Sequence, residues 1–120
     1  MILDSNIIIY AAQAEHSVLR AFILEHNPCV STVSYVEVLG YHNLTETERR
    51  YFEEFFGFAE LVDISLPVLD RAVSLRQQRK MGLGDALIAG TALTHGFRLV
   101  THNLEDFEWV DGLEVLDPLV

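Results

Sequence analysis

Four carboxylates spread over most of the chain are the side chains best suited to chemistry: Asp4, Glu37, Asp85 and Asp106. Two of them lie against apolar sequence, since Asp4 follows Ile-Leu and Asp85 opens the run Asp-Ala-Leu-Ile-Ala. A charge in such surroundings is costly without a partner. Several carboxylates at one site also repel one another, and a hard divalent cation such as Mg²⁺ or Mn²⁺ removes that repulsion. Two such ions, roughly 4 Å apart, can activate water and stabilise the leaving oxygen of a phosphodiester.

Each acid taken singly also has a purely structural interpretation. Asp4 and Asp85 are of a residue type that caps the amino termini of helices. Glu37 follows Ser34 by three residues, which is the spacing of a capping box, and Asp106 fits an ordinary loop. The metal-site hypothesis therefore depends on a fold that brings the four acids together.

The elements that must position these acids are short strands alternating with helices. Short apolar segments bounded by turn residues predict buried strands, and apolar positions three and four apart predict amphipathic helices. Their alternation is typical of a mostly parallel sheet covered on both faces. We therefore predict an α/β fold, a three-layer α/β/α sandwich with a mostly parallel central sheet, as a single domain over residues 1–120. The predicted strands are 1–3, 29–32, 60–64, 97–101 and 113–116. The predicted helices are 7–12, 33–41, 45–57, 66–80 and 86–95, with a further helix that begins at residue 18 and is ended by Asn27-Pro28.

Ligands of an open parallel sheet bind outside the carboxyl ends of its strands, where the following helices present their amino termini. The predicted elements put all four acids at such places. Asp4 directly follows the first strand, and Glu37 lies in the opening turns of the third helix. Asp85 begins the last helix, and Asp106 follows the strand that ends at Thr101.

Composition limits the class of protein. With 50% hydrophobic and 22% charged residues, the 120-residue chain is typical of a folded globular domain. Its apolar stretches are far shorter than the roughly 20 residues that span a bilayer, and its first residues lack the basic segment of a secretory signal. Cys29 is the only cysteine, so an internal disulfide is excluded. We expect a cytoplasmic protein with no membrane contact.

Four segments together resemble the PIN domain family, and within it the VapC-type toxin ribonucleases: Leu3–Asn6, Val36–Gly40, Gly84–Ala89 and Thr101–Phe107. They occur in the family's order and span nearly the whole chain. The resemblance implies a parallel α/β/α sandwich, Mg²⁺- or Mn²⁺-dependent cleavage of RNA, and a homodimer. It also implies a small antitoxin protein as a partner that blocks the site.

Carried over residue by residue, the resemblance makes the four acids the metal-holding and catalytic side chains. One departure is Gly84, where many relatives have proline before the aspartate, and this loosens the loop but keeps the acid. The family uses further positions to orient the carboxylates or bound water, and these match Ser5, Asn6, Thr101 and Asn103.

Charge bears on RNA binding, because 18 acidic against 8 basic residues give a net charge of −10, which repels a polyanion. Arg76, Arg79 and Lys80 occur at i, i+3 and i+4 of one predicted helix, just before Asp85. We predict that they form a positive stripe that binds RNA phosphates. The alternative is that they only solvate the carboxyl end of that helix, where the dipole favours cations.

Other chemistries find less support. The five histidines show no metal-ligand spacing, and Cys29 has no cysteine partner, so a structural zinc site is not expected. A receiver-like phosphoacceptor needs a lysine late in the chain, whereas Lys80 is the only lysine. Without a Ser/His/Asp or Cys/His nucleophile set, we expect direct hydrolysis with no covalent intermediate. The alternative function is a catalytically inactive PIN-like module that binds protein or RNA.

Overall fold

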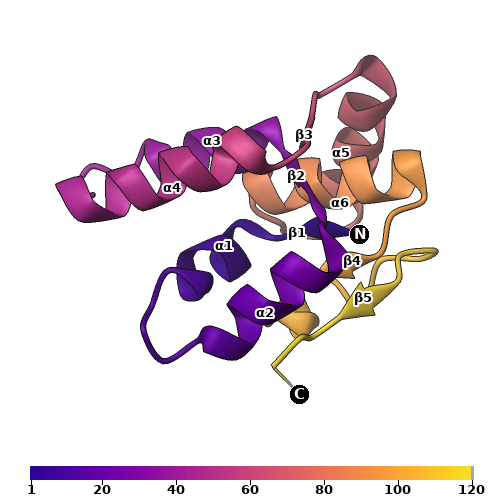
Figure 1. Cartoon of the computed structure of the whole chain (residues 1–120). Coiled ribbons are helices and arrows are strands. Elements are labelled where there is room, and N and C mark those ends of the chain that lie inside the picture. The colour runs from indigo at the N-terminus through magenta and orange to yellow at the C-terminus, as the bar shows by residue number, and fades with distance from the viewer. Residues whose placement is uncertain (120) are drawn as a thin grey trace.

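The computed structural model describes residues 1–119, which form five parallel strands with helices on both sides (Figure 1). The order across the sheet is β3-β2-β1-β4-β5. The strands are β1 (Ile2–Leu3), β2 (Cys29–Ser31), β3 (Leu61–Val62), β4 (Leu99–Val100) and β5 (Val115–Leu116). The helices are α1 (Ser5–Ala11), α2 (Ser17–His26), α3 (Thr32–Leu39), α4 (Glu46–Phe58), α5 (Leu66–Gln78) and α6 (Leu83–His95), with a short 3₁₀ helix, η1 (Leu104–Asp106).

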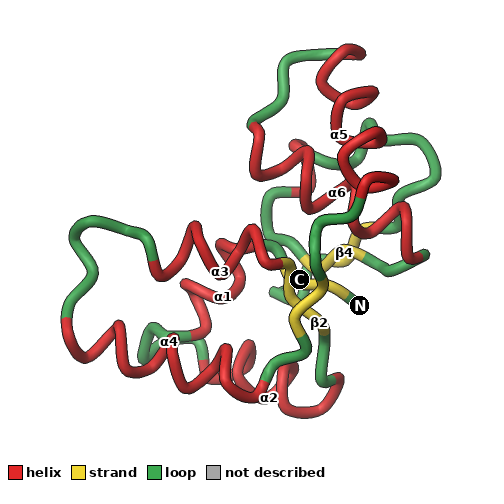
Figure 2. The backbone as a smooth tube through the Cα atoms, turned by 90° about the horizontal axis from the view of Figure 1, so that it is seen from above, coloured by secondary structure: helices red, strands yellow, loops and turns green. Residues whose placement is uncertain are grey.

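The two residues of β1 show how the layers arise. Successive side chains of a strand point to opposite faces of the sheet. Ile2 packs into an apolar cluster with Ala89 of α6, whereas Leu3 packs into a second cluster with Leu19 of α2 and Phe52 of α4. Figure 2 accordingly shows α5 and α6 on one side of the strands and α1, α2 and α4 on the other. The predicted α/β/α sandwich with a parallel sheet is confirmed.

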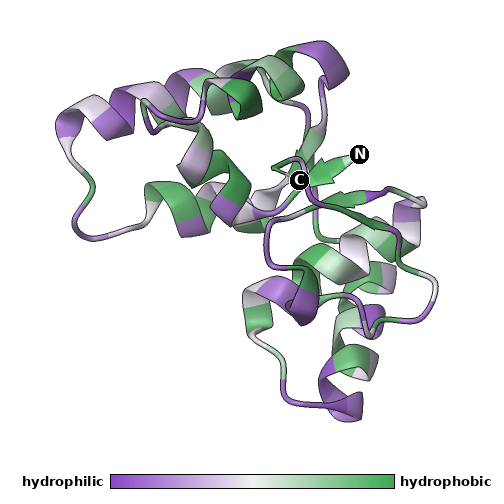
Figure 3. Cartoon of the chain, turned by 90° about the horizontal axis from the view of Figure 1, so that it is seen from below, coloured by the Kyte–Doolittle hydropathy of each residue, from purple (hydrophilic) through white to green (hydrophobic). Residues whose placement is uncertain are grey.

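The two central strands, β1 and β4, are buried on both faces. Every residue of β1 and β4 is inaccessible to solvent, and Figure 3 shows these strands coloured as hydrophobic between the two groups of helices. Alternating apolar and polar residues are therefore absent from them, as is typical of parallel strands. Within residues 1–119 the helices also stop short of the length and apolar character needed to cross a membrane.

Local sequence signals fix most helix ends. Thr45 and Glu48 form a reciprocal capping box at the start of α4. Ser65 caps α5, and Pro67 lies in its first turn, where its missing N–H costs nothing. Asn27 ends α2 in the left-handed conformation, with φ of 44°.

Most helix boundaries differ from the sequence prediction by one to three residues, and two of these differences lie next to Asp85. The predicted helix 66–80 ends at Gln78, and Arg79 is extended with φ of −165°. The side chain of Arg76 stabilises this exit, because its Nε–H donates to the carbonyl oxygen of Met81 over 3.1 Å. The predicted helix 86–95 begins earlier, at Leu83, so that Gly84 lies inside its first turn.

A smaller difference concerns α4, for which Gly57 was expected to be the stop. The helix continues to Phe58, and Gly57 is an exposed position inside its last turn. Phe52 and Phe56 bury the inner face of the helix, and this packing carries the helix past a residue with low helix propensity.

Candidate functional site

The carboxyl ends of β1 and β4 meet at the centre of the sheet. The strand order changes direction at this point: β2 and β3 extend the sheet on one side of β1, and β4 and β5 extend it on the other. Such a switch point is where open parallel sheets bind their ligands. Asp4 and Thr101 are the first residues after these two strands, and the Asp4 N–H donates to the carbonyl of Val100 over 2.9 Å. This backbone bond places the two side chains next to each other.

Asp4 is buried, with 3% of its surface exposed, and its carboxylate is held by a short relay of donors. The Thr101 hydroxyl donates to Asp4 Oδ2 over 2.9 Å, and the Asn103 N–H donates to the Thr101 oxygen over 3.0 Å. Burial raises the pKa of Asp4 above its ordinary 3.8, and the hydrogen bonds from Thr101 and the Ser5 backbone offset part of that rise. Asp4 occupies the N-cap position of α1, as the capping interpretation predicts, but its side chain makes no capping hydrogen bond there.

Glu37 lies on the second turn of α3, whose N-cap is Ser31 rather than Ser34. The predicted capping box is therefore wrong: the Ser31 hydroxyl accepts the Val33 N–H, and Ser34 is buried inside the helix. Ser5 Oγ instead lies 2.7 Å from Glu37 Oε1 and 2.8 Å from Ser34 Oγ. Since one hydroxyl carries one proton, Ser5 donates to the carboxylate, and Ser34 supplies the donor of the second contact.

Asp85 is the third residue of α6, and Gly82 occupies the N-cap, so Asp85 does not cap the helix from that position. Its pKa is raised from 3.8 to about 6. Desolvation is the main cause, and the negative charges of Asp4, Asp106 and Glu37 add to it. The three other predicted acids thus lie close enough to Asp85 to act on its charge, as the metal-site hypothesis requires.

Asp106 ends η1 and is exposed. The indole N–H of Trp109 donates to its backbone carbonyl over 2.9 Å and so anchors the segment. Asp106 and Asp85 line one side of a cleft of about 150 Å³ whose other walls include Arg79 and Lys80. Two of the four carboxylates and two basic side chains therefore open onto one small space.

The three basic residues do not form the predicted helical stripe, because α5 ends before two of them. Arg76 remains on the helix and is engaged with the Met81 carbonyl. Arg79 lies over the Trp109 ring at 4.9 Å from its centre, a cation–π contact. The cleft wall formed by Arg79 and Lys80 is thus a consequence of the extended exit from α5.

The positions predicted to orient the carboxylates separate into two groups. Ser5, Thr101 and Asn103 are hydrogen-bonded to the acids or to one another as described above, whereas Asn6 is exposed. Sequence reasoning missed the contributions of Ser34 and Trp109. Ser34 precedes Glu37 by three residues, so the two side chains lie on the same face of the helix. This spacing could have indicated a shared contact, but it was interpreted as a capping box.

The side chains present suit a divalent metal ion. Carboxylate oxygens are the donors that hard cations take, and besides desolvation the charges of three other acids raise the pKa of Asp85. In the described residues 1–119, no three Asp, Glu, His or Cys side chains already converge on a single point.

The fold and the site define a class of protein: a parallel sheet covered on both faces, with a buried aspartate at its switch point and further acids near it. A family model described as the PIN domain matches residues 1–113. The chain therefore belongs to the PIN domain family, and nucleases of that family depend in general on divalent metal ions.

Known proteins similar to the chain agree with this. The tRNA(fMet)-specific endonuclease VapC of Shigella flexneri is 32% identical over 96% of this chain and 95% of its own length. Ribonuclease VapC1 of Rickettsia felis is 51% identical over 41 residues, which are 34% of this chain and 31% of that protein. A solved toxin–antitoxin complex from Klebsiella pneumoniae contains a chain that is 25% identical, with a TM-score of 0.78, over 98% of this chain and 96% of that one.

Proposed function

We propose that the protein is a metal-dependent endoribonuclease, the toxin of a toxin–antitoxin pair, and that residues 1–120 form its single nuclease domain. The observation that carries the proposal is the buried Asp4 carboxylate at the switch point of the sheet, which accepts a hydrogen bond from Thr101 and lies close enough to Asp85 for the two charges to repel. The named activities of the VapC relatives support RNA as the substrate.

Asp4, Glu37, Asp85 and Asp106 are the residues that would hold the metal, and Mg²⁺ or Mn²⁺ is the cofactor that this all-oxygen donor set favours. When bound, the ion supplies Lewis-acid activation of water and neutralises charge on the phosphodiester. The protein's own contribution is orientation. The hydrogen bond from Thr101 fixes the orientation of the Asp4 carboxylate. A metal ligand that is held in one orientation limits how far a phosphate bound at the metal can move.

The cleft beside Asp85 is the proposed binding site for the RNA backbone. Arg79 and Lys80 line it, and the Trp109 ring beneath Arg79 holds the guanidinium in place. A guanidinium and an ammonium at this position are suited to a phosphate oxygen next to the metal site. They give a chain of net charge −10 a local region of opposite sign.

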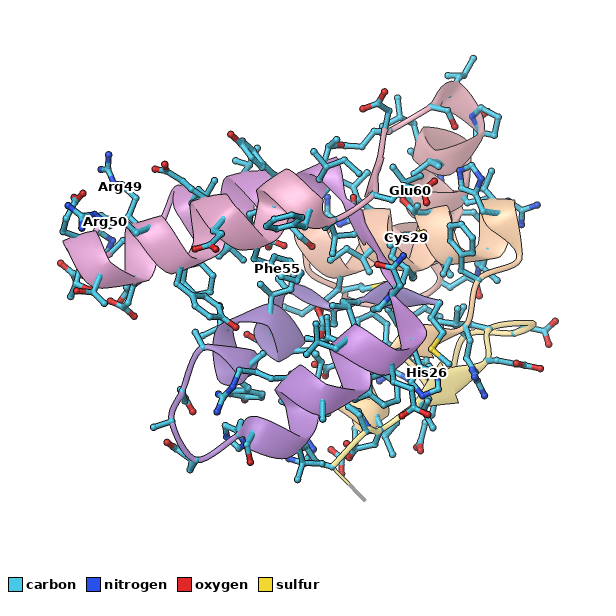
Figure 4. The ribbon with its side chains drawn as sticks, in the orientation of Figure 1. His26, Cys29, Arg49, Arg50, Phe55 and Glu60 are labelled. Carbon is cyan, nitrogen blue, oxygen red and sulfur yellow. The ribbon has the colours of Figure 1, made fainter. Side chains whose placement is uncertain are left out.

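This assignment has a direct test in salt-dependent binding. Arg79→Gln with Lys80→Gln should weaken binding of a single-stranded RNA and lower the slope of log affinity against log salt by about 0.7 for each lost phosphate contact. The matched control is Arg49→Gln with Arg50→Gln, two exposed arginines at the start of α4 (Figure 4). Equal slopes for wild type and the Arg79/Lys80 variant would contradict the assignment.

We also propose a small antitoxin protein and a second copy of the chain as partners. The similar Klebsiella pneumoniae chain comes from a toxin–antitoxin complex, which supports the first. Exposed apolar side chains support a protein partner as well: Leu24 and Phe58 are 84% and 86% exposed beside a groove of about 400 Å³ between α2 and α4. Figure 4 shows Phe55, which also lines that groove, pointing from α4 toward α2.

The decisive experiment measures RNA cleavage with Mg²⁺, Mn²⁺ or EDTA, using wild type and an Asp4→Asn, Asp85→Asn double variant. We expect cutting that needs the metal and is lost in the variant. A third variant, Asp70→Asn, removes an exposed acid on α5 and should cut like wild type. If wild type neither cuts nor binds metal in calorimetry, the proposal fails, and the chain is a PIN-like binding module.

A further inference from the structure

The side chains of His102 and Asp117 form a bonded pair beside the site. They follow β4 and β5, which lie side by side in the sheet with Val100 opposite Leu116 (Figure 1). His102 Nδ1 lies 2.9 Å from Asp117 Oδ2. An ionised carboxylate only accepts hydrogen bonds, so the ring nitrogen donates and Nδ1 carries a proton. The contact therefore fixes both the orientation and the tautomer of the ring.

Asp117 is anchored independently of the histidine. Its side chain is only 6% exposed, and its second oxygen, Oδ1, accepts the Leu119 N–H over 2.9 Å. Leu119 packs against the same apolar cluster as Leu3. On the other side of the histidine, the rings of Tyr10 and His102 meet at 80° with their centres 6.2 Å apart. The buried carboxylate is thus a fixed point that holds the His102 ring against α1.

His102 is the middle residue of the turn that orients Asp4. The Thr101 oxygen accepts the Asn103 N–H over 3.0 Å, so its single proton is left for the bond to Asp4 Oδ2. The backbone N–H of Asp106 donates in turn to the Asn103 carbonyl over 3.1 Å. A displacement of His102 therefore reaches one acid through the Thr101 hydroxyl and another through the backbone of η1.

We propose that Asp117 is a positioning residue for the metal site: through His102 it holds the turn of residues 101–103, and this turn orients Asp4 and places Asp106. The inference rests on the proposed function, in which those two acids hold the divalent cation. Asp106 is exposed, so anchors elsewhere in its segment must fix its place. Groups that orient metal ligands strengthen metal binding because they limit the motion of the ligands.

The test separates the two ring nitrogens of His102. An asparagine amide N–H takes nearly the place of the Nδ1–H, whereas the longer glutamine reaches the place of Nε2. His102→Asn should keep the bond to Asp117 and retain the Mn²⁺ affinity of wild type in calorimetry. His102→Gln loses that bond, and Asp117→Asn leaves one acceptor oxygen for two donors. Both should bind Mn²⁺ about three- to tenfold more weakly.

Two controls isolate charge and stability. Asp111→Asn removes an exposed acid in the turn before β5 and should leave the Mn²⁺ affinity unchanged. Thr45→Ala removes the cap of α4 and should lower the melting temperature of the metal-free protein by about 3–6 °C. Its Mn²⁺ affinity should equal that of wild type, because its effect is on the fold and not on the turn.

Amide hydrogen exchange of Asn103, followed by NMR in metal-free protein, tests the turn without the ion. Exchange should be faster than in wild type for Asp117→Asn and His102→Gln and unchanged for His102→Asn. Unchanged exchange in Asp117→Asn overturns the inference, and so does an unchanged Mn²⁺ affinity of that variant.

Two further outcomes also overturn it. Equal Mn²⁺ losses in both His102 variants would place the effect at Nε2 and not at the bond to Asp117. A loss in Thr45→Ala as large as that in Asp117→Asn would make the effect one of general stability. A wild type that binds no Mn²⁺ overturns the proposed function, while the exchange rates still decide whether Asp117 holds the turn.

Discussion

Asp85 should make the metal-free protein less stable at neutral pH than in mild acid. Its pKa is about 6 in the folded state against 3.8 ordinarily, chiefly because folding desolvates it and then because three other carboxylates repel its charge. Well below pH 3.8 the group is protonated in the folded and the unfolded chain, so it costs nothing. As pH rises from 4 to 6 the unfolded chain gives up the proton first, and the free energy of unfolding falls.

The size of this effect follows from the two pKa values. The rise from 3.8 to about 6 corresponds to about 3 kcal/mol once both states are ionised. Asp85 is partly accessible to solvent, which screens the repulsion and lowers the expected value to about 1–3 kcal/mol. Asp85→Asn removes the charge with little change in shape, so it should be more stable than wild type by that amount at pH 7.5 and nearly equal to it at pH 4.

The assay is urea unfolding of metal-free protein at pH 4 and pH 7.5, followed by circular dichroism. Asp70→Asn is the matched control, because it neutralises an exposed aspartate on α5 and should leave the stability within about 0.5 kcal/mol at both values. Excess Mn²⁺ at pH 7.5 should stabilise wild type and not Asp85→Asn. The metal should therefore narrow or reverse the difference in the free energy of unfolding between the two proteins. A stability gain of Asp85→Asn that is absent, or that stays the same at both pH values, would refute the reasoning.

Three further changes test other parts of the structure. Thr101→Val removes the hydroxyl that Asp4 accepts from and should cost about 1–3 kcal/mol in urea unfolding, with weaker Mn²⁺ binding in calorimetry. Arg76→Gln loses the bond to the Met81 carbonyl and should cost about 1 kcal/mol in the same unfolding assay, while leaving the salt slope of RNA binding unchanged. Phe52→Ala opens a cavity under α4 and should lower the free energy of unfolding by about 3–5 kcal/mol, also measured with urea.

The layers and the location of the site could be predicted because they follow from general rules. Short apolar segments between helices leave little choice but a covered parallel sheet, and parallel strands end at one edge. Asp4 therefore had to lie at that edge as soon as its strand was recognised, and Thr101 had to lie there too. Their side-by-side placement needed the strand order, which periodicity does not contain.

The errors arose where a local signal competed with a distant contact. Ser34 and Glu37 have the spacing of a capping box, but α3 starts one turn earlier at Ser31, and the buried Ser34 hydroxyl meets Ser5 across the site. Arg79 continues the helical pattern of α5, yet the chain leaves the helix before it and lays its guanidinium on the Trp109 ring. Neither partner is close in sequence, so no local pattern could have revealed it.

The strongly negative charge of the chain is compatible with the proposed RNA substrate, because two basic side chains lie together in one cleft beside the acidic site. Burial, together with repulsion from nearby acids, raises the pKa of Asp4 and of Asp85, so a divalent ion that binds removes a repulsion as well as adding two positive charges. Arg79 and Lys80 share the cleft of Asp85 and Asp106. The net charge of −10 then opposes long-range attraction of RNA, whereas the cleft decides what happens on contact. RNA binding should accordingly depend on the metal ion far more than the total charge suggests.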